Sequence, residues 1–213
     1  MKYRIEDLIK RYPSLQSIQI EQTYDILKNG FATFHTVYFC GNGGSASDCE
    51  HMVGELMKSF RLPRPLSQKE QAVLTQYGEI GDNLAQNLQQ TLPAVSLVSP
   101  TALNSAISND MGAEYVYAQQ VYGYGTPGDV LVCFSTSGNS KNILYAATAA
   151  RARGMKVIGF SGRTGGKLKA LCDVCICCPS DSTEEIQEYH LPIYHALCRS
   201  LEEYFWGAEE ERL

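Results

Sequence analysis

The sequence lacks any apolar run long enough to cross a membrane, and it has no excess of basic residues. A spanning helix needs about 18 consecutive apolar residues, and the apolar runs here are much shorter. The 18 Lys and Arg are outnumbered by 23 Asp and Glu, which gives a net charge of −5 at pH 7. Non-specific nucleic-acid binding depends on a basic surface. We therefore expect neither a membrane protein nor a nucleic-acid-binding protein.

A secretion signal is also missing, because Glu6 and Asp7 stand where a signal peptide would have apolar residues. We therefore expect a cytoplasmic protein. Its 213 residues are 44% hydrophobic and 19% charged, an ordinary globular composition. A chain of this length can bury a core without disulfides or metals, and we expect a single domain over residues 1–213.

Eight cysteines are present, and three of them form a C-x-x-C-x-x-C pattern at Cys172, Cys175 and Cys178. This spacing resembles that of cluster ligands. Residues 173–178 instead have the composition of a buried strand, on which Cys172 and Cys178 would face away from Cys175. We expect packed core thiols rather than a metal cluster.

Short apolar runs alternate with helical segments along the chain, which predicts a doubly wound, mostly parallel five-stranded α/β sheet with helices on both faces. The predicted strands are residues 36–40, 94–98, 129–134, 156–160 and 173–178. The predicted helices are an N-terminal segment at 1–33, broken near Pro13, and residues 47–59, 101–107, 112–122, 140–153 and 182–205. Residues 66–92 are polar and Gln-rich with helical stretches, and we interpret them as an insertion.

The first predicted strand runs into the glycine-rich segment 41–45, which opens a helix. Glycines let the backbone approach a ligand, and the free N–H groups of a helix start favour an anion. Gly41, Gly43 and Ala46 also match the dinucleotide pattern G-x-G-x-x-A. That reading needs an acidic residue at the end of the next strand, where Ser99 and Pro100 stand instead. We therefore disfavour dinucleotide binding.

The third predicted strand runs into a second loop, which carries four hydroxyls at Ser135, Thr136, Ser137 and Ser140. Hydroxyls next to helix N–H groups suit a monoester phosphate. No Gly-Lys-Ser/Thr follows, so the loop is not a P-loop. Taken alone, the segment fits equally well a turn in which Ser140 caps the next helix.

The segment Cys40-Gly41-Asn42-Gly43-Gly44-Ser45, followed by Ser135-Thr136-Ser137-Gly138-Asn139-Ser140, resembles the sugar isomerase (SIS) family of phosphosugar-binding domains. Residues 108–110 and 154–158 add to this resemblance, which covers nearly the whole chain apart from residues 66–92. Within the family, the chain is similar to the bacterial phosphoheptose isomerases. The resemblance implies a flavodoxin-like SIS fold and an aldose–ketose isomerase that interconverts sedoheptulose 7-phosphate and D-glycero-D-manno-heptose 7-phosphate.

The resemblance also implies a zinc ion, about one per subunit, near the sugar. Its ligands would be His51, Glu55, Gln187 and His195. Two histidines, a carboxylate and an amide are suitable donors. His51 and Glu55 are four residues apart on one helix and can converge on one ligand. Spacing alone does not choose His195 over His190, and only the family pattern favours His195.

An aldose–ketose isomerisation needs a base at a carbon-bound proton and an acid at the carbonyl oxygen. We assign Glu55 as the base and His195 as the acid, although binding to zinc would weaken Glu55 as a base. The expected phosphate contacts are Gly43, Ser45, Ser135, Thr136, Ser137 and Ser140. The expected contacts with sugar hydroxyls are Asn42, Asp110 and Gln187.

The chain departs from the family pattern at Ser59, where an arginine is usual, and at Glu184 and Glu185, which precede Ile186-Gln187. These changes and the insertion leave the exact sugar open. Alternatives are an isomerase of another phosphosugar, a phosphosugar sensor, or a non-catalytic binder of a replication initiator, which would lack the histidine found here at position 195. The resemblance further implies a homotetramer, with the N-terminal helices and the aromatic residues at 204–206 as candidate contacts.

Overall fold

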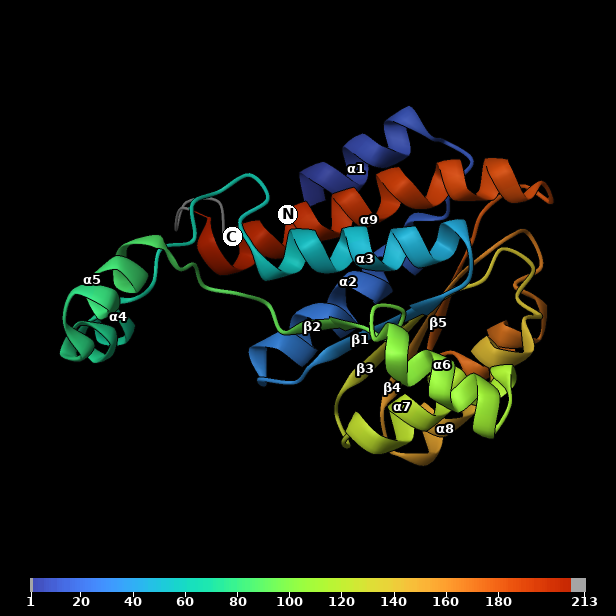
Figure 1. Cartoon of the computed structure of the whole chain (residues 1–213). Helices are drawn as coiled ribbons and strands as arrows, with labels where there is room; N and C mark the ends of the chain where they lie inside the picture. The colour runs from blue at the N-terminus through green and yellow to red at the C-terminus, as the bar shows by residue number, and fades with distance from the viewer. Residues whose placement is uncertain (1, 208–213) are drawn as a thin grey trace.

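The computed structural model describes residues 2–207 and, within them, the side chains of residues 5–207. Met1 of the predicted N-terminal segment and residues 208–213 of the predicted domain lie outside the described residues. The chain forms a five-stranded sheet flanked by helices on both faces, with a separate pair of helices that projects from the body (Figure 1).

The five strands are all parallel and lie in the order β2-β1-β3-β4-β5. Their bounds are β1 Val37–Gly41, β2 Ala94–Ser96, β3 Val130–Phe134, β4 Lys156–Ser161 and β5 Val174–Cys177. The predicted doubly wound fold is therefore confirmed, and its sheet is parallel throughout. Strand order reverses between β1 and β3, and ligands of such sheets bind at this point.

The two faces of the sheet are covered by different helices. One face carries α1 (Lys2–Arg11), α2 (Ser17–Ala32), α3 (Gly44–Met57) and α9 (Thr183–Trp206); the other carries α6 (Thr101–Asp110), α7 (Val116–Tyr124) and α8 (Lys141–Ala152) (Figure 1). Successive strand residues point to opposite faces, so Val37 and Phe39 pack under α3 and α9 whereas Tyr38 and Cys40 pack against the other layer. Each predicted helix is present, with ends that differ by up to three or four residues.

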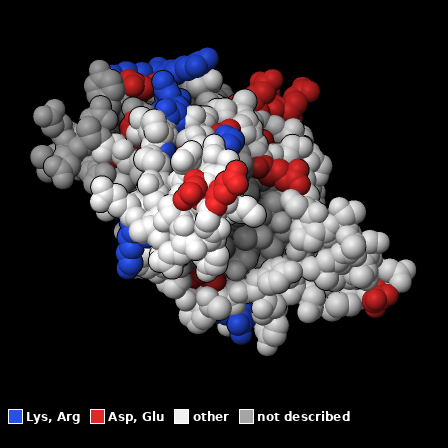
Figure 2. Space-filling model, turned by 60° about the vertical axis from the view of Figure 1, so that its left-hand side comes forward, with Lys and Arg blue, Asp and Glu red and all other residues white. Residues whose placement is uncertain are grey.

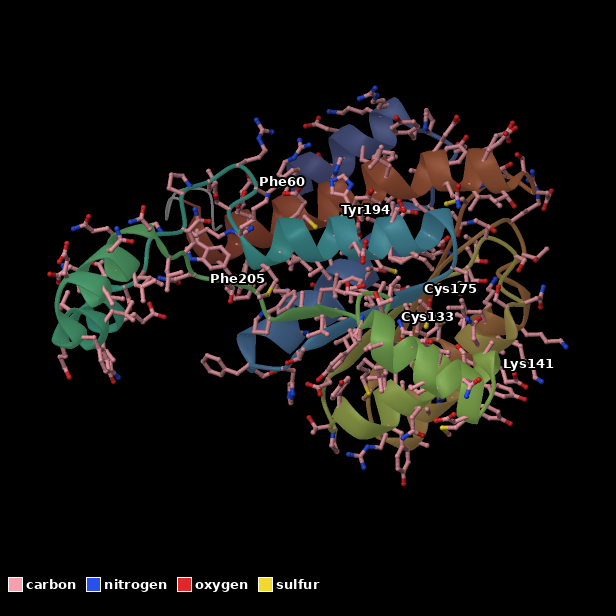
Figure 3. All side chains as sticks on the ribbon, in the orientation of Figure 1. Phe60, Cys133, Lys141, Cys175, Tyr194 and Phe205 are labelled. Carbon is pink, nitrogen blue, oxygen red and sulfur yellow. The ribbon has the colours of Figure 1, made fainter. Side chains whose placement is uncertain are left out.

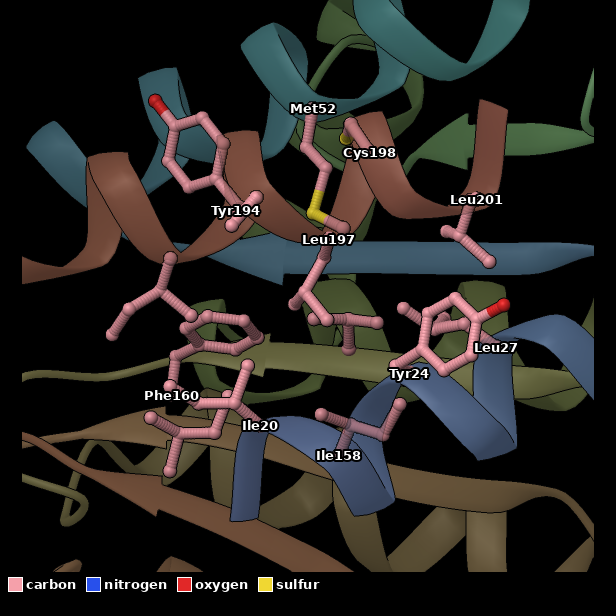
Figure 4. Close-up of a cluster of buried hydrophobic side chains, with 14 of the residues drawn as sticks. Ile20, Tyr24, Leu27, Met52, Ile158, Phe160, Tyr194, Leu197, Cys198 and Leu201 are labelled. Atoms are coloured by element: carbon pink, nitrogen blue, oxygen red, sulfur yellow. The ribbon is translucent and has the colours of Figure 1, made fainter. Parts of the chain in front are cut away.

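The core beneath α3 and α9 is built mainly from aliphatic and aromatic side chains. Figure 4 shows Leu197 and Leu201 reaching from α9 toward the sheet, where Phe160 and Ile158 lie. Phe134 and Phe160, on neighbouring strands, stack with their ring centroids 4.4 Å apart. This buried layer packs α9 and α3 side by side along the sheet. Because α3 follows β1 and α9 follows β5, both helices start near the carboxyl ends of the strands.

The predicted insertion forms a helical arm. It consists of α4 (Gln68–Leu74), the short 3₁₀ helix η1 (Thr75–Tyr77) and α5 (Gly78–Asn87), and it projects from the end of the molecule where α3 stops (Figure 1). Its base is closed by an antiparallel bridge between Pro65 and Gln89. Two further 3₁₀ helices, η2 (Ala113–Tyr115) and η3 (Gly166–Leu171), complete the elements. No helix among the described residues is long and apolar enough to span a membrane.

All eight cysteines are unpaired, but one prediction about them is wrong. Cys172 does not face away from Cys175, because it precedes β5 and does not follow the alternation of a strand. The sulfurs of Cys172 and Cys175 instead both lie against Gly159 of β4, whereas Cys178 joins the core on the opposite face. Burial raises the pKa of the Cys178 thiol to about 12, so this thiol is neutral and packs as a small apolar group.

Candidate active site

The two predicted phosphate loops meet at one edge of the sheet. Gly41 ends β1 and Phe134 ends β3, and the two residues are register partners. The first loop, residues 42–43, leads into α3, and the second loop, residues 135–140, leads into α8. Both loops therefore lie where the strand order reverses, at the start of a helix.

In the second loop, Ser140 stands at the N-cap of α8, yet its side chain makes no capping hydrogen bond. Its hydroxyl instead accepts a hydrogen bond of 3.4 Å from Ser135. The Ser137 hydroxyl accepts from the Asn139 N–H at 3.1 Å. The capped-turn interpretation is thus not supported, and the hydroxyls at Ser135 and Ser140 remain within reach of a ligand.

Gly138 shapes this loop. Its φ is +63°, and a side chain there would collide with the backbone of Gly165 and Gly166. The loop after β4 is thereby packed directly against the second loop, and Gly162 N–H donates to the Thr136 carbonyl at 2.9 Å. The residue type at 138 is fixed by this close approach.

Asn42 joins the first loop to the start of α8. Its side-chain amide exchanges two hydrogen bonds with that of Asn142, at 2.9 and 2.8 Å. The Tyr117 hydroxyl donates to the Gly41 carbonyl at 2.6 Å. Asn142 and Tyr117 were not singled out from the sequence, since each lies on a helix with no motif of its own. Together they set the distance between the two loops.

The first loop also meets α9. Gly43 has a φ of +57°, and α3 begins directly after it. A side chain at Gly44 would overlap the amide of Gln187, so the glycine admits Gln187 to the start of α3. Ser45 is buried, and its N–H donates to the Asn42 carbonyl at 3.1 Å.

Asp110 is the predicted sugar contact that the structure leaves apart. It is the last residue of α6, it is exposed, and it accepts a hydrogen bond of 2.8 Å from its neighbour Asn109. Within residues 5–207, the structure shows no hydrogen bond between Asp110 and either loop.

The structure brings His51, Glu55 and His195 together on adjacent turns of α3 and α9. His51 Nε2 lies 3.4 Å from Glu55 Oε1 and 3.3 Å from His195 Nε2. Glu55 Oε2 is also 3.1 Å from Lys58 Nζ. The cluster contains two imidazoles and a carboxylate, and His51 is within hydrogen-bond reach of both other groups, which suits proton transfer.

His190, the histidine that spacing could not separate from His195, lies elsewhere. It is fully buried, with ring centroids 5.5 Å from both Phe134 and Phe160. Burial lowers the pKa of His190 to about 4. The pKa of His195 is also lowered, first by partial burial and then by His51 and Arg199, although Glu55 opposes this shift. His195 is therefore the histidine of α9 at the site, and its neutral form is favoured.

Two further residues that sequence reasoning missed stand behind His51. The Tyr194 hydroxyl lies 3.0 Å from His51 Nδ1 and 3.3 Å from Asp48 Oδ1. Burial raises the pKa of Asp48, while the Tyr194 hydrogen bond and His51 lower it. Burial and the nearby Asp48 raise the pKa of Tyr194, so its hydroxyl keeps its proton. Asp48 lies three residues before His51, and that spacing was the only available signal.

The donor atoms of the predicted zinc ligands meet part of the geometric requirement. Donors about 2.0–2.1 Å from a tetrahedral zinc are about 3.3–3.4 Å from one another, and His51 Nε2 has such separations from Glu55 Oε1 and His195 Nε2. Gln187 lies eight residues before His195, about 12 Å along α9. Among the described residues, no group of three or more His, Cys, Asp or Glu side chains is already arranged as a metal site. The donor types fit zinc, and closure around it would require side-chain rearrangement.

A pocket of about 210 Å³ opens beside His195, between α1 and α9. Arg11 and Arg199 are among its lining residues, and Arg199 Nε is buried without a hydrogen-bond partner. Positive charge therefore lies next to His195 although position 59 has no arginine. The Ser59 N–H donates to Gln89 Oε1 at 2.7 Å, at the base of the arm.

Glu184 and Glu185, the other departure, stand in the first turn of α9. Negative charge is favourable at a helix N-terminus, and Glu185 Oε2 accepts a hydrogen bond of 2.5 Å from the Ser180 hydroxyl. These two carboxylates thus have a local structural explanation. On the face shown in Figure 2, Lys and Arg side chains lie at separate points rather than in one continuous patch.

Comparison with known proteins supports the family resemblance found in the sequence. The SIS domain family profile matches residues 72–162. A phosphoheptose isomerase of Akkermansia muciniphila is 35% identical over 203 residues, which cover 95% of this chain and 94% of that protein. The structure of the phosphoheptose isomerase of Neisseria gonorrhoeae superimposes with a TM-score of 0.70 at 31% identity, covering 95% and 91% of the two chains. That of Francisella tularensis gives 0.75 at 28% identity, covering 95% and 94%.

These similarities extend along nearly the full length of both partners. The chain belongs to the phosphoheptose isomerase family of SIS-domain proteins.

Proposed function

We propose that this protein interconverts sedoheptulose 7-phosphate and D-glycero-D-manno-heptose 7-phosphate. The observation that carries this proposal is the placement of a carboxylate and two histidines on the helix pair that begins at the phosphate loops. His51 lies seven residues after Gly44, about 10 Å along α3. A substrate held by its phosphate at the loops can therefore extend its other end toward this cluster.

In this mechanism, Ser45, Ser135, Thr136, Ser137 and Ser140 hold the phosphate with the backbone at Gly43. Asn42 and Gln187, which lie at the loops, contact the sugar hydroxyls. Asp110 keeps the same proposed role, which requires that the substrate or a movement of α6 bridge the space to the loops. Such positioning lowers the entropy cost of reaching the reactive geometry.

Glu55 removes the proton from the carbon next to the carbonyl, and His195 delivers a proton to the carbonyl oxygen, which gives an enediol. Glu55 then returns the proton to the former carbonyl carbon, and His195 takes a proton from the hydroxyl of the other carbon. The carbonyl thus moves by one carbon and no atom is lost. The neutral form of His195 is favoured by its lowered pKa, and its N–H can donate to the oxygen as negative charge develops there.

Zinc is a proposed cofactor, at about one ion per subunit, with His51, Glu55, Gln187 and His195 as its ligands. When bound, zinc would polarise the sugar oxygens and stabilise negative charge. Glu55 is a weaker base while it binds the metal, so its two proposed roles oppose each other.

A homotetramer in the cytoplasm is the proposed form of the protein. Phe205 and Trp206 pack partly against their own chain, and Trp206 Nε1 donates to Gln90 at 3.0 Å. Tyr204 is more exposed than these two and is the better candidate contact among the aromatic residues at the end of α9.

The test is turnover of sedoheptulose 7-phosphate, followed by NMR with and without added zinc. The wild type should convert it, and His195→Ala should abolish conversion while still binding the phosphosugar. The matched control is His35→Gln, which changes a histidine that pairs with Asp129 away from the site. Conversion of a shorter phosphosugar alone would show that the proposed substrate is wrong and the isomerase class is right. Phosphosugar binding with neither zinc nor turnover would favour a binding protein.

A further inference from the structure

Three polar side chains form a line: Asp48 on α3, Tyr194 on α9 and His51, again on α3. Asp48 Oδ1 lies 3.3 Å from the Tyr194 hydroxyl, which lies 3.0 Å from His51 Nδ1. The opposite nitrogen of the same ring, His51 Nε2, faces Glu55 and His195. The line therefore ends at the proposed reaction centre.

Tyr194 is held rigidly at the middle of this line. Its side chain is 1% exposed, and its ring contacts the rings of Phe134, His51 and His195 at centroid distances of 6.3, 5.4 and 5.1 Å. Figure 3 shows Tyr194 between α9 and α3, and Figure 4 shows its hydroxyl directed toward α3 and away from the sheet.

On the Nδ1 side of the His51 ring, the donors and acceptors of Asp48 and Tyr194 favour one arrangement of protons. Oδ2 of Asp48 is buried without a partner, and the hydroxyl of Tyr194 is the partner that the structure gives to Oδ1. A second orphaned oxygen would add a further desolvation penalty. The hydroxyl hydrogen therefore goes to Asp48, and the hydroxyl oxygen is left to accept a hydrogen bond from His51 Nδ1.

We propose that Tyr194 and Asp48 are positioning residues that hold His51 in the Nδ1–H tautomer, which leaves Nε2 without a proton beside Glu55 and His195. A neutral imidazole carries its proton on one nitrogen only, so this choice leaves Nε2 free to accept a proton or bind a metal. Carboxylate partners behind a metal-binding histidine act in the same way. Here the tyrosine hydroxyl relays the effect of the carboxylate.

The direct test is the tautomer of His51, read from long-range ¹H–¹⁵N NMR of histidine-labelled protein without added metal, at about pH 8, where imidazoles are largely neutral. The chain has only four histidines, and loss of one signal in His51→Gln identifies the signal of His51. We expect the Nδ1–H form in the wild type. The Nε2–H form in the wild type would overturn the proposal.

Tyr194→Phe removes both hydrogen bonds and keeps the buried ring, so the fold should survive. We expect His51 to lose its preference for Nδ1–H and to show a mixture of tautomers. An unchanged tautomer in a folded variant would contradict the proposal. Asp48→Asn is the second variant, because its amide can donate to the Tyr194 oxygen. The hydroxyl then donates to Nδ1, and the Nε2–H form should increase.

A second readout is zinc affinity, measured by competition with a chelator. Loss of such a partner behind a ligand typically weakens metal binding about 10- to 100-fold, and we expect this range for Tyr194→Phe. The matched control is Tyr24→Phe, which removes another buried hydroxyl, one without a hydrogen-bond partner, and should leave zinc affinity unchanged. Equal affinities in wild type and Tyr194→Phe would argue against a positioning role.

The link from this device to turnover depends on the proposed function, but the tautomer does not. If the wild type has no isomerase activity and His51 still shows the Nδ1–H form, the proposed reaction fails and the positioning role stands. If the wild type is active and Tyr194→Phe retains its kcat, zinc affinity and tautomer, the positioning role fails and the reaction stands.

Discussion

The α3–α9 helix pair carries two polar clusters of opposite character. In the first cluster, which lies in the second half of α3 and the middle of α9, His51, Glu55 and His195 are partly exposed, and His51 lies within 3.4 Å of the other two side chains. In the second cluster, at the far end of the pair, Arg64 and Glu202 are completely buried and joined by a hydrogen-bonded ion pair of 2.8 Å.

Arg64 and Glu202 both have partners that suit their charge. Arg64 donates to the carbonyls of Leu56 and Glu55 at 2.7 and 3.0 Å, and its guanidinium lies 4.5 Å from the Trp206 ring centroid. The Glu202 carboxylate accepts from the backbone N–H groups of residues 60–62. Arg64 thus satisfies carbonyls that the end of α3 leaves free.

The cluster of His51, Glu55 and His195, with the residues next to it, lacks this saturation. Asp48 Oδ2 and Arg199 Nε are buried without partners, and His51 has two neighbours that could each use its Nε2. Buried polar groups are normally satisfied in a folded protein, so exceptions need a reason. One pair of helices therefore separates a structural cluster, which is complete, from a functional cluster, which awaits a ligand.

Glu55 takes part in both clusters, and it gives the largest expected effect. Its backbone carbonyl is held by Arg64 while its carboxylate faces His51. We expect Glu55→Gln to lower turnover of sedoheptulose 7-phosphate by about 10²- to 10⁴-fold, as for loss of a general base, with an unchanged unfolding midpoint. Steady-state kinetics and urea denaturation measure the two quantities.

Lys58→Gln is the matched control for this change. Lys58 is exposed and lies 3.1 Å from the other Glu55 oxygen, and an exposed pair of this kind contributes little. Turnover should therefore stay close to that of the wild type. Full turnover by Glu55→Gln with zinc bound would show that Glu55 is not the base.

Glu202→Gln tests the saturated end. It leaves Arg64 charged and buried without its counter-charge, which costs about 3–5 kcal/mol in comparable pairs. The matched control is Asp181→Asn, because Asp181 pairs with Arg163 at the same 2.8 Å but on the surface. Its cost should stay below about 1 kcal/mol. Similar urea midpoints for both variants would mean that burial does not distinguish the two pairs.

The buried histidine of α9, His190, adds a pH-dependent test of stability. The pKa of His190 is about 4 in the folded protein, against about 6.5 when unfolded. The unfolded state therefore binds the proton first, and stability is lost as pH falls from about 6.5 to 4. The contribution is about 2 kcal/mol between pH 7 and pH 5. Urea denaturation at both values measures this loss.

His190→Leu should remove this part of the pH dependence while keeping a side chain of similar size between Phe134 and Phe160. Its stability should fall less than that of the wild type between the two pH values. An identical fall in both proteins would show that another group causes the loss and that His190 is not held neutral by burial.

Much of the fold could be predicted because it follows from local patterns. Continuous apolar runs gave the five strands, and glycine and serine after two of them gave the two loops, since both signals lie within a few residues of sequence. The choice between His190 and His195 could not be made from spacing, because it depends on which one the phenylalanines of β3 and β4 bury.

The contacts of Tyr194, Asp48 and Asn142 were also beyond prediction, for the same physical reason. Each forms its bond to a residue at least 100 positions away in the sequence, and only the packing of the fold brings the two residues together. Cys172 was misplaced because the prediction extended strand alternation past the first residue of β5. Periodicity is reliable only within an element, and the position of its end decides which face a flanking residue joins.

The arm gives the smallest expected effect, because it leaves the saturated end of the helix pair and packs mainly on itself (Figure 1). Replacing residues 67–87 with a short glycine–serine turn keeps the bridge between Pro65 and Gln89. Loop length changes stability only slowly, so we expect the free energy of unfolding to change by less than about 1 kcal/mol, and zinc binding to be retained. A loss of more than about 2 kcal/mol in urea would place the arm in the cooperative unit that holds Arg64 and Glu202, and the two clusters of the helix pair would then differ in size as well as in saturation.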